Sequence, residues 1–238
     1  MKGIDGKLKR EFEITVRRQR YGENNAYYEK IKYESFDDRE TVGAALMEIN
    51  SQRDDKIEWE NSCLQRKCGA CAMRINGVPK LACDVRLWDF PGKNIKLEPL
   101  KKFQVLADLI VDRSILRENL IRIKAWHENV VRPKEDMQEE GFDSSRCLQC
   151  GLCLEICPNF YVEGEFVGTA GFVSAKRIMI DAEGEKKDKI KNNYQRYYFE
   201  GCGKSLACRD ICPAGINIDK LMVKSNTIFG KIKSRKIH

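Results

Sequence analysis

The 238-residue sequence has little histidine, no long apolar run and no nucleotide-binding motif. Its 2 histidines, His127 and His238, have no Ser or Cys nucleophile pattern and no metal-binding neighbour beside them, so we expect both on the surface. No stretch approaches the roughly 18 apolar residues that cross a bilayer, which predicts a protein that neither spans a membrane nor is exported by itself. No GxGxxG follows a strand pattern, no P-loop occurs, and GTAG at 168–171 is better explained as a turn entering a helix. We therefore expect no site that makes or breaks a substrate bond.

Cysteine, by contrast, is abundant, and the second half of the chain contains two related runs of it. The first has the spacing C-x2-C-x2-C-x3-C, and the second repeats that spacing with Ser205 in the second place. A proline, Pro158 or Pro213, follows the last cysteine of each run. In two-cluster ferredoxins the cysteine before the proline crosses to the other cluster. This rule assigns a 4Fe-4S cluster to Cys147, Cys150, Cys153 and Cys212, and a 3Fe-4S cluster to Cys157, Cys202 and Cys208.

The other four cysteines form a separate group in the first half of the chain. Their C-x4-C-x2-C spacing with a later fourth cysteine is the plant-type arrangement for a 2Fe-2S cluster. Gly69 would let the backbone approach this cluster without a Cβ in the way. The predicted ligands are Cys63, Cys68, Cys71 and Cys83, and with them all 11 cysteines have a role.

Disulfides and zinc are the alternative uses of these cysteines. A disulfide scaffold would favour an even count in a short secreted chain. Zinc also binds soft thiolates, but structural zinc sites usually separate two CxxC pairs by a dozen or more residues. The compact CxxCxxCxxxCP run favours clusters over both.

The sequence predicts an α+β fold with two domains. Residues 12–16 and 27–33 have the alternation of paired strands, and 72–75 and 81–83 form a second hairpin around Asn76-Gly77. A helix is expected over 41–49 with Asp37 or Asp38 as N-cap. These elements indicate a β-grasp 2Fe-2S ferredoxin domain over residues 1–103.

The second domain, over 104–238, is expected to be helical with the two remaining clusters. Apolar residues from Phe103 to Ile123 recur at helical intervals, which predicts a helix reaching about Trp126. Further helices are expected near 172–180 and 218–228, with the cysteine runs at their ends.

The net charge of +7 is partly due to a basic C-terminal segment. This segment could contact anionic lipid or an acidic partner, or it could be a solvated, frayed terminus. Basic residues elsewhere are scattered and not interleaved with aromatic ones, so we expect no nucleic-acid binding. The segment contains Lys220, Lys224, Lys231, Lys233, Arg235 and Lys236.

The order of these motifs resembles the iron-sulfur subunit of succinate dehydrogenase and fumarate reductase. The segments GACAMRING, LKKFQVLADLIVDRS and GCGKSLACRDICPAGI are similar to that family beyond their cysteines. The resemblance implies an electron-transfer subunit of an oxidoreductase, with no substrate site of its own. It also implies a flavoprotein partner with FAD, a membrane anchor with quinone or haem, and a peripheral position on the cytoplasmic side of the membrane. Electrons would pass between FAD and the anchor through the 2Fe-2S, 4Fe-4S and 3Fe-4S clusters in that order.

Two residues depart from the ubiquinone-reducing members of the family. Those members carry a Trp and a His where this chain has Val162 and Gly203. The GCGxSxxC form resembles members that work with menaquinone, often through a haem-bearing anchor, and favours that version. The residues expected to line the anchor-facing surface, or alternatively to pack around the cluster, are Pro158, Asn159, Phe160, Tyr161 and Lys204.

Two other functions remain open. One is an iron-sulfur subunit of a soluble flavoprotein complex, a thiol or disulfide-linked fumarate reductase, which the missing quinone residues favour. The other is a free-standing polyferredoxin shuttle, although shuttle ferredoxins tend to be small and acidic whereas this chain is basic.

Overall fold

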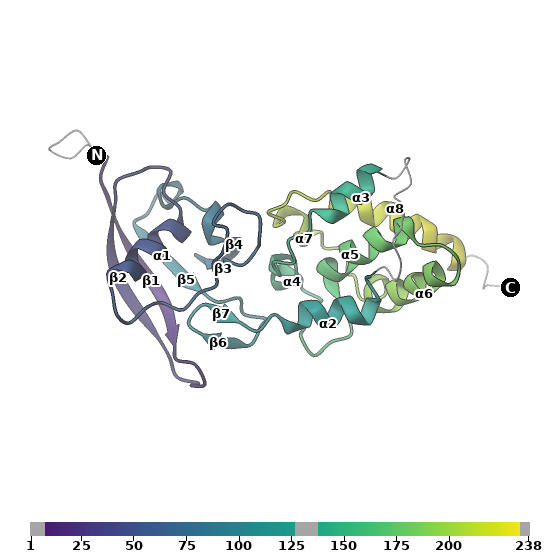
Figure 1. The fold of residues 1–238 in the computed structure, drawn as a ribbon, viewed down its shortest axis with the longest axis horizontal. Coiled ribbons are helices and arrows are strands. Elements are labelled where there is room, and N and C mark those ends of the chain that lie inside the picture. The colour runs from purple at the N-terminus through teal and green to yellow at the C-terminus, as the bar shows by residue number, and fades with distance from the viewer. Residues whose placement is uncertain (1–7, 127–137, 234–238) are drawn as a thin grey trace. The chain divides into compact units, whose positions relative to one another are not determined.

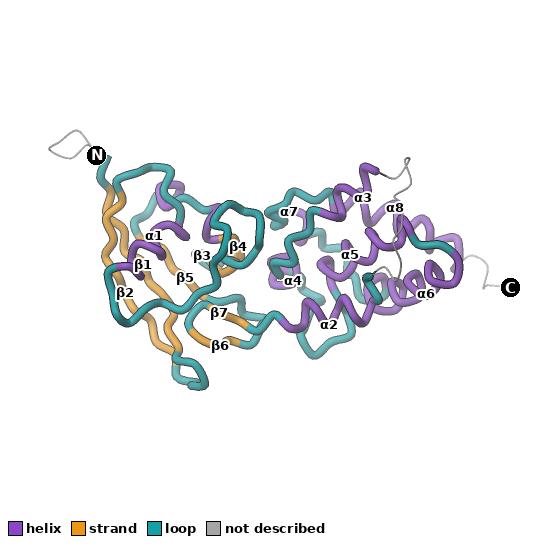
Figure 2. Tube along the Cα trace, in the orientation of Figure 1, coloured by secondary structure: helices purple, strands orange, loops and turns teal. Residues whose placement is uncertain are grey.

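The computed structural model describes residues 8–126 and 138–233. The chain divides into two compact units, Met1–Asp112 and Arg113–His238, coloured from purple to teal and from teal to yellow in Figure 1. Strands dominate the first unit and helices the second (Figure 2), so the fold is α+β as expected. The strands are β1 (Arg10–Gln19), β2 (Ala26–Ser35), β3 (Ala72–Ile75), β4 (Val78–Leu81), β5 (Asn94–Glu98), β6 (Val105–Ala107) and β7 (Ile110–Val111). The helices are α1 (Val42–Ser51), α2 (Ser114–Ile123), α3 (Gln138–Ser145), α4 (Leu152–Ile156), α5 (Gly168–Asp181), α6 (Gly184–Tyr194), α7 (Ala207–Asp210) and α8 (Ile218–Lys233), with short helical turns η1 (Ala82–Asp84), η2 (Leu87–Asp89) and η4 (Gln195–Phe199).

The first unit is a five-stranded mixed sheet in the order β2-β1-β5-β3-β4. β1 pairs antiparallel with β2 and parallel with β5, and β3 pairs antiparallel with β4 and β5. Alternate residues of β1, namely Phe12, Ile14 and Val16, are almost fully buried, as the alternation of the sequence predicts. This arrangement is the predicted β-grasp sheet.

Both predicted hairpins and the predicted helix of the first unit are present, with one change at the helix cap. Asn76 and Gly77 have φ of 48° and 80°, as a two-residue hairpin turn requires. α1 is capped by Thr41, whose hydroxyl accepts from the Ala44 N–H at 3.1 Å, and not by Asp37 or Asp38. Asp37 instead accepts from the backbone N–H of Arg39 at 2.9 Å, so its side chain closes the preceding turn.

The helix predicted from Phe103 onward is wrong before residue 114. Residues 105–111 form the small hairpin β6-β7, and only α2 is helical. Asp108 turns this hairpin at φ 36° and accepts from the N–H of Gln19 at 2.7 Å and of Glu58 at 2.8 Å. These bonds to distant segments stabilise a strand hairpin that local periodicity does not reveal. They also tie the segment to the first unit, which ends at Asp112 rather than at the expected residue 103.

The second unit is built around α5, which packs against α2, α3, α4, α6 and α8. The predicted helices near 172–180 and 218–228 correspond to α5 and α8, whereas α3, α4, α6 and α7 were not predicted because they are short or highly charged. Residues 168–171 are the first turn of α5, in agreement with the expected helix entry. Gly168 has φ 63°, and a Cβ there would lie 2.2 Å from Cδ2 of Leu154, so this close approach of α4 and α5 requires glycine.

Four aromatic rings form the centre of the helical core. Phe172 stacks on Tyr198 with centroids 4.5 Å apart, and Phe166 stacks on the same tyrosine at 5.6 Å. Tyr194 packs beside both Phe172 and Tyr198. Tyr198 lies in η4, a π-helical turn that continues α6 toward Cys202. We call these four residues the aromatic cluster.

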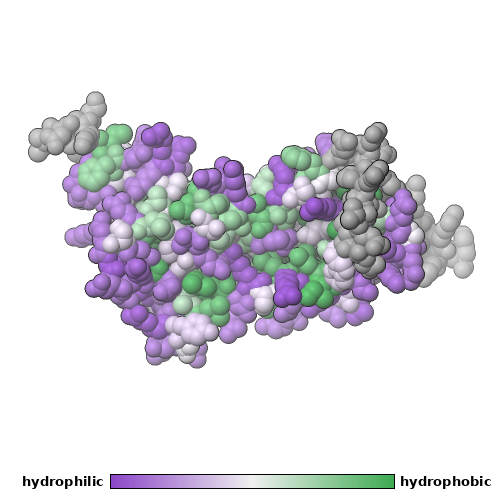
Figure 3. All heavy atoms as spheres, in the orientation of Figure 1, coloured by the Kyte–Doolittle hydropathy of each residue, from purple (hydrophilic) through white to green (hydrophobic). Residues whose placement is uncertain are grey.

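The face of the molecule shown in Figure 3 carries many hydrophilic residues on both units, interspersed with apolar areas. The large apolar side chains that are more than half exposed include Tyr21, Phe142, Tyr161 and Val223. None of the helices within 8–126 and 138–233 is both long and apolar enough to cross a membrane.

Candidate iron-sulfur sites

All 11 cysteines lie in the described residues, and none forms a disulfide. We call the three predicted ligand groups the loop site, the cavity site and the three-cysteine site. Across the described ranges, no three His, Cys, Asp or Glu side chains converge closely enough to hold a single metal ion. The loop site contains Cys63, Cys68, Cys71 and Cys83; the cavity site contains Cys147, Cys150, Cys153 and Cys212; the three-cysteine site contains Cys157, Cys202 and Cys208.

The loop site is held between the β3-β4 hairpin and α1. Cys71 precedes β3, Cys83 follows β4 in η1, and their sulfur atoms lie 3.3 Å apart. α1 contacts η1 through Gly43, where a Cβ would lie 3.3 Å from the backbone nitrogen of Cys83. A larger residue at 43 would therefore push against the cluster loop, a constraint that the sequence analysis missed.

Backbone N–H groups surround the thiols of the loop site. Cys63 Sγ accepts from the N–H groups of Gln65 and Lys67, each at 3.3 Å, and Cys83 Sγ accepts from Arg66 N–H at 3.3 Å. Positive φ values at Leu64, Arg66 and Gly69 bend the loop around the sulfur atoms. Successive N–H groups that converge in this way stabilise anions. The loop is therefore suited to thiolates bound to a cluster.

The pKa values of the loop-site thiols differ according to these contacts. The N–H groups of Gln65 and Lys67 lower the pKa of Cys63 to about 7. Burial, with the nearby Cys83, raises the pKa of Cys71 to about 12. A bound metal centre deprotonates such a thiol outright. The soft thiolate donor set and the converging N–H groups both fit an iron-sulfur cluster.

The cavity site surrounds one small, mostly apolar cavity in the helical unit. Three of its thiols come from the first run and the fourth, Cys212, from the second, as the crossing rule predicts. The other lining residues include Val173, Ile216 and Ile218. A cavity bounded by four thiols and apolar side chains fits a metal cluster, because soft thiolates are the preferred ligands of iron-sulfur centres.

Burial controls the pKa values of the cavity-site thiols. It raises the pKa of Cys147, of Cys150 to about 11, and of Cys153 well above its usual value. Neighbouring thiolates add to the effect at each of them. The charged forms therefore require positive charge inside the cavity, which cluster iron would supply.

Arg146 connects the two cysteine runs beside this cavity. Its guanidinium donates to the carbonyl oxygens of Ala214 at 2.9 Å and Gly215 at 3.0 Å, directly after Cys212. It also pairs with Asp143 of α3 at 2.7 Å. Because Arg146 precedes Cys147, these contacts fix the spacing between ligands that are distant in sequence. No local sequence pattern indicates this role.

The thiols of the three-cysteine site interact with one another. Burial raises the pKa of Cys208, the Thr169 hydroxyl opposes this, and the charges of Cys157 and Cys202 add to it. Cys202 Sγ lies 3.9 Å from the hydroxyl of Tyr198, whose pKa is raised by burial and by Cys202. The aromatic cluster thus forms one wall of this site.

Ser205 is exposed between Cys202 and Cys208, in a strained stretch of backbone. The residues on either side, Lys204 and Leu206, have φ of 56° and 58°. Such values are uncommon in residues other than glycine and often accompany functional sites. A serine hydroxyl is a weaker iron ligand than a thiolate, and this site offers three thiols.

The five residues expected at an anchor-facing surface separate into two groups. Pro158, Asn159, Tyr161 and Lys204 are exposed, with Tyr161 64% exposed. Phe160 is fully buried. It therefore packs inside the helical unit, which was the alternative expectation, and is not part of the exposed surface. Asn159 donates to the carbonyl of Gly201 at 2.9 Å, and a Cβ at Gly203 would lie 3.0 Å from its Oδ1. The Asn159 amide thus occupies the space into which a side chain at 203 would project.

The other residues named in the sequence are the two histidines and the six basic residues of the C-terminal segment. His127, His238, Arg235 and Lys236, and the side chains of Lys231 and Lys233, lie outside the described parts of the chain. Lys220 pairs with Glu139 at 2.7 Å, and Lys224 pairs with Glu140. These two lysines therefore belong to ion pairs of the helical unit.

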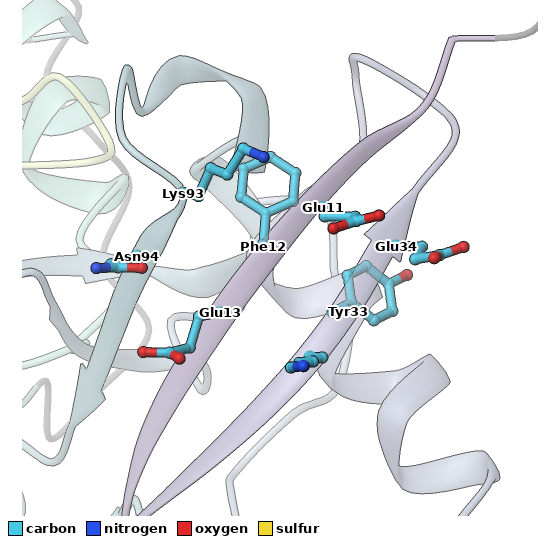
Figure 4. A pocket seen from close by; sticks show the side chains of 8 residues that line it. Glu11, Phe12, Glu13, Tyr33, Glu34, Lys93 and Asn94 are labelled. Carbon is cyan, nitrogen blue, oxygen red and sulfur yellow. The ribbon is translucent and has the colours of Figure 1, made fainter. Parts of the chain in front are cut away.

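A separate surface depression lies on the strand unit. Figure 4 shows its side chains, which come from β1, β2 and the start of β5 and include Glu11, Tyr33 and Lys93. Two of its carboxylates, Glu13 and Glu34, pair with Lys30 at 3.0 Å and Lys9 at 2.9 Å. The charges are therefore largely compensated by neighbours, and we assign no cofactor to it.

Two family models match this chain. The 2Fe-2S iron-sulfur cluster binding domain matches residues 13–118 and the 4Fe-4S dicluster domain matches residues 143–216. Among solved structures, a chain of the Mycobacterium smegmatis Sdh1 complex in the apo form has a TM-score of 0.78 at 21% identity, over 97% of this chain and 100% of that one, which supports the fold.

Two curated relatives show the family. The fumarate reductase iron-sulfur subunit of Wolinella succinogenes is 29% identical over 226 residues, which cover 85% of this chain and 91% of that protein. The succinate dehydrogenase iron-sulfur subunit of Bacillus subtilis is 32% identical over 192 residues, which cover 74% of this chain and 76% of that protein. The chain therefore belongs to the family of iron-sulfur subunits of succinate dehydrogenase and fumarate reductase.

Proposed function

We propose that this chain is the electron-transfer subunit of a membrane-bound succinate:quinone or quinol:fumarate oxidoreductase. The observation that carries the proposal is the cavity site, where Cys212 joins three thiols of the other run. This crossing is the ligand pattern of a two-cluster ferredoxin. Together with the three-cysteine site and the loop site, it gives one chain the ligands for three redox centres.

The proposed ligands follow the three sites. The loop site holds a 2Fe-2S cluster, the cavity site a 4Fe-4S cluster and the three-cysteine site a 3Fe-4S cluster. When bound, these clusters supply one-electron transfer at potentials set by cluster type, charge, hydrogen bonds to sulfur and exposure. The chain's own residues hold the sulfur atoms in place, donate N–H groups to them in the loop site, and keep the cavity site apolar.

The proposal includes two kinds of partner. A flavoprotein with FAD would exchange electrons with the loop site, and a membrane anchor with quinone or haem would exchange them with the three-cysteine site. The chain would be peripheral on the cytoplasmic side of the membrane, held there by its partners. The exposed residues Pro158, Asn159, Tyr161 and Lys204 are candidates for the anchor-facing surface.

We favour menaquinone over ubiquinone as the electron carrier. Gly203 has no side chain, and the Asn159 amide fills the adjacent space, so a His cannot be accommodated there unless Asn159 moves. The same observation supports a second candidate, an iron-sulfur subunit of a soluble flavoprotein complex that reduces fumarate with thiols. In that case no quinone would bind beside the three-cysteine site.

Iron and acid-labile sulfide analysis tests the cluster assignment. The anaerobically purified chain should contain about nine irons, the sum of the three cluster types. Ser205→Cys should convert the three-iron cluster to a four-iron cluster and abolish the electron paramagnetic resonance signal of an oxidised three-iron centre. About ten irons in the wild type, or zinc in place of iron, would contradict the assignment.

Purification under gentle conditions tests the partners. A complex that contains FAD and requires detergent would support the membrane-bound enzyme, and a detergent-independent complex with FAD would support the soluble candidate. A lone monomer under low-salt conditions would indicate a ferredoxin shuttle and contradict both.

A further inference from the structure

Gln149 occupies an unusual position beside the cavity site. It is the second residue between Cys147 and Cys150, and its φ of 51° places it in the left-handed region. From there its side-chain Nε2 lies 3.3 Å from Cys147 Sγ, 3.2 Å from the carbonyl of Ala170 and 3.0 Å from Oγ of Ser174. One side-chain amide therefore bridges a proposed cluster ligand and the central helix α5.

The contacts to α5 fix which end of the amide faces the sulfur. The Ala170 carbonyl can only accept a hydrogen bond, so the NH₂ group must face it. The hydroxyl of Ser174 donates to the same carbonyl at 3.2 Å, which leaves its lone pairs to accept from Gln149. The two N–H groups of the amide therefore serve three acceptors, with one N–H shared between two of them. A flipped amide would place two carbonyl oxygens against each other and lose these bonds. The NH₂ group is thus also the end next to Cys147 Sγ.

The surroundings make this contact electrostatically effective. The cavity is mostly apolar, and Oε1 of Gln149 is buried without a hydrogen-bond partner among the described residues. A low local dielectric strengthens a hydrogen bond relative to water. An N–H donor withdraws electron density from a ligand sulfur, which stabilises the more negative, reduced form of a cluster.

We propose that the Gln149 side chain is a positioning residue that raises the reduction potential of the 4Fe-4S cluster by donating a hydrogen bond to Cys147 Sγ. The proposal rests on the ligand assignment under Proposed function. The Gln149 amide would be a determinant of the reduction potential of the 4Fe-4S cluster that the cysteine pattern does not predict. The backbone N–H of Gln149 also contacts Cys147, so a side-chain substitution removes only the amide donor.

The decisive variant is Gln149→Met, which has a similar length and no donor. In the intact complex, a potentiometric titration monitored by electron paramagnetic resonance should show a lower potential for the four-iron cluster. Loss of one hydrogen bond should change the reduction equilibrium constant by about twofold to tenfold, and a tenfold change corresponds to about 59 mV for one electron. Gln149→Glu, which replaces the donor with a negative charge, should lower the potential further.

Two controls separate tuning from a general disturbance. Ser174→Ala removes one anchor but keeps the donor on Cys147, so its shift should be smaller than that of Gln149→Met. The potential of the 2Fe-2S cluster in the other unit should not change in any variant. If Gln149→Met assembles its cluster poorly, Gln149→Asn, whose amide is one methylene shorter and which tolerates positive φ, should give the same downward shift.

The outcomes distinguish a failure of the tuning role of Gln149 from a failure of the cluster assignment. An unchanged or higher potential in Gln149→Met or Gln149→Asn, with a normal four-iron signal, would overturn the tuning role and leave the cluster assignment intact. If the wild-type chain gave no four-iron signal at all, the assignment of the cavity site would be wrong.

Discussion

The loop site and the cavity site supply hydrogen bonds to their sulfur atoms in different ways. In the loop site the donors are backbone N–H groups of an exposed loop, including those of Gln65, Arg66 and Lys67. In the cavity site backbone N–H groups also contact the sulfur atoms of Cys147 and Cys150, and the side chain of Gln149 adds a further donor. A backbone donor persists whatever residue occupies the position, whereas a side-chain donor can be lost by one substitution. The potential of the helical unit's clusters should therefore be more sensitive to sequence.

The two units also differ in what keeps their ligands in place. The loop site depends on a hairpin and on the contact between α1 and η1. The helical sites depend on the aromatic cluster and on charged contacts among α3, α5 and α8. Substitutions in these contacts should affect one unit and leave the other unchanged.

The largest effect is expected for Phe172→Ala. Phe172 is fully buried and stacks on Tyr198, so the cavity left by its ring should lower the free energy of unfolding of the helical unit by about 3–5 kcal/mol. Chemical unfolding, followed by near-ultraviolet circular dichroism, measures this change. Phe142→Ala is the matched control, because Phe142 is 66% exposed, and should cost far less. Equal losses in the two variants would show that the aromatic cluster is not a centre of stability.

A smaller loss is expected for Glu140→Gln. Glu140 of α3 pairs with Lys176 of α5 at 2.9 Å and with Lys224 of α8, and Lys176 is only 3% exposed. The substitution leaves this buried ammonium group without its partner charge and should cost roughly 1–3 kcal/mol at neutral pH. Urea unfolding at pH 7 tests the magnitude.

The same pair predicts a pH dependence of stability. Burial opposes the charged form of Glu140, but the Lys224 and Lys176 ammonium groups outweigh it and lower the pKa of this carboxyl below 4.5. Its contribution is therefore complete above pH 4.5 and is lost as the pH falls through the lower folded-state pKa. Glu140→Gln should flatten the acid limb, whereas Glu185→Gln, which removes the exposed pair with Lys189, should leave it almost unchanged. An unaltered acid limb in Glu140→Gln would contradict the assignment.

The cysteine runs are the strongest signal in the sequence because cluster chemistry restricts both residue type and spacing. The pairing of Cys212 with Cys147, Cys150 and Cys153 follows from a crossing rule and agrees with the lining of the cavity. The two hairpins of the strand unit were predictable for a similar reason, since alternation and the Asn76-Gly77 turn are local signals.

Contacts between distant segments could not be predicted. Asp108 accepts hydrogen bonds from Gln19 and Glu58, and these bonds convert an apparently helical stretch into the β6-β7 hairpin. The position of Phe160 near the ligand Cys157 does not reveal whether its ring lies at the surface or packs inside, and the ring is fully buried. The contacts of Gln149 and Arg146 likewise depend on the positions of α5 and of the segment after Cys212.

A weaker effect is expected at the three-cysteine site for Tyr198→Phe. The hydroxyl lies 3.9 Å from Cys202 Sγ, a longer contact than that of Gln149 with Cys147. Its removal should lower the potential of the three-iron cluster, by less than Gln149→Met lowers that of the four-iron cluster. Redox titration measures the shift, and Tyr197→Phe, which removes the hydroxyl of a ring that packs against Arg196, is the control. A larger shift in Tyr197→Phe would contradict a role for the Tyr198 hydroxyl.

The smallest effect on any potential is expected for Lys67→Glu in the loop site. Lys67 is exposed, and its backbone N–H, which donates to Cys63 at 3.3 Å, remains in the variant. The potential of the 2Fe-2S cluster should therefore change little, because exposed charges are screened by water and salt. If the loop from 62 to 71 docks on the flavoprotein, however, the charge reversal should slow association at low salt. Lys80→Glu, an equal change on β4, is the control and should leave association unchanged. A potential that shifts as much in Lys67→Glu as in Gln149→Met would remove the distinction between backbone and side-chain donors.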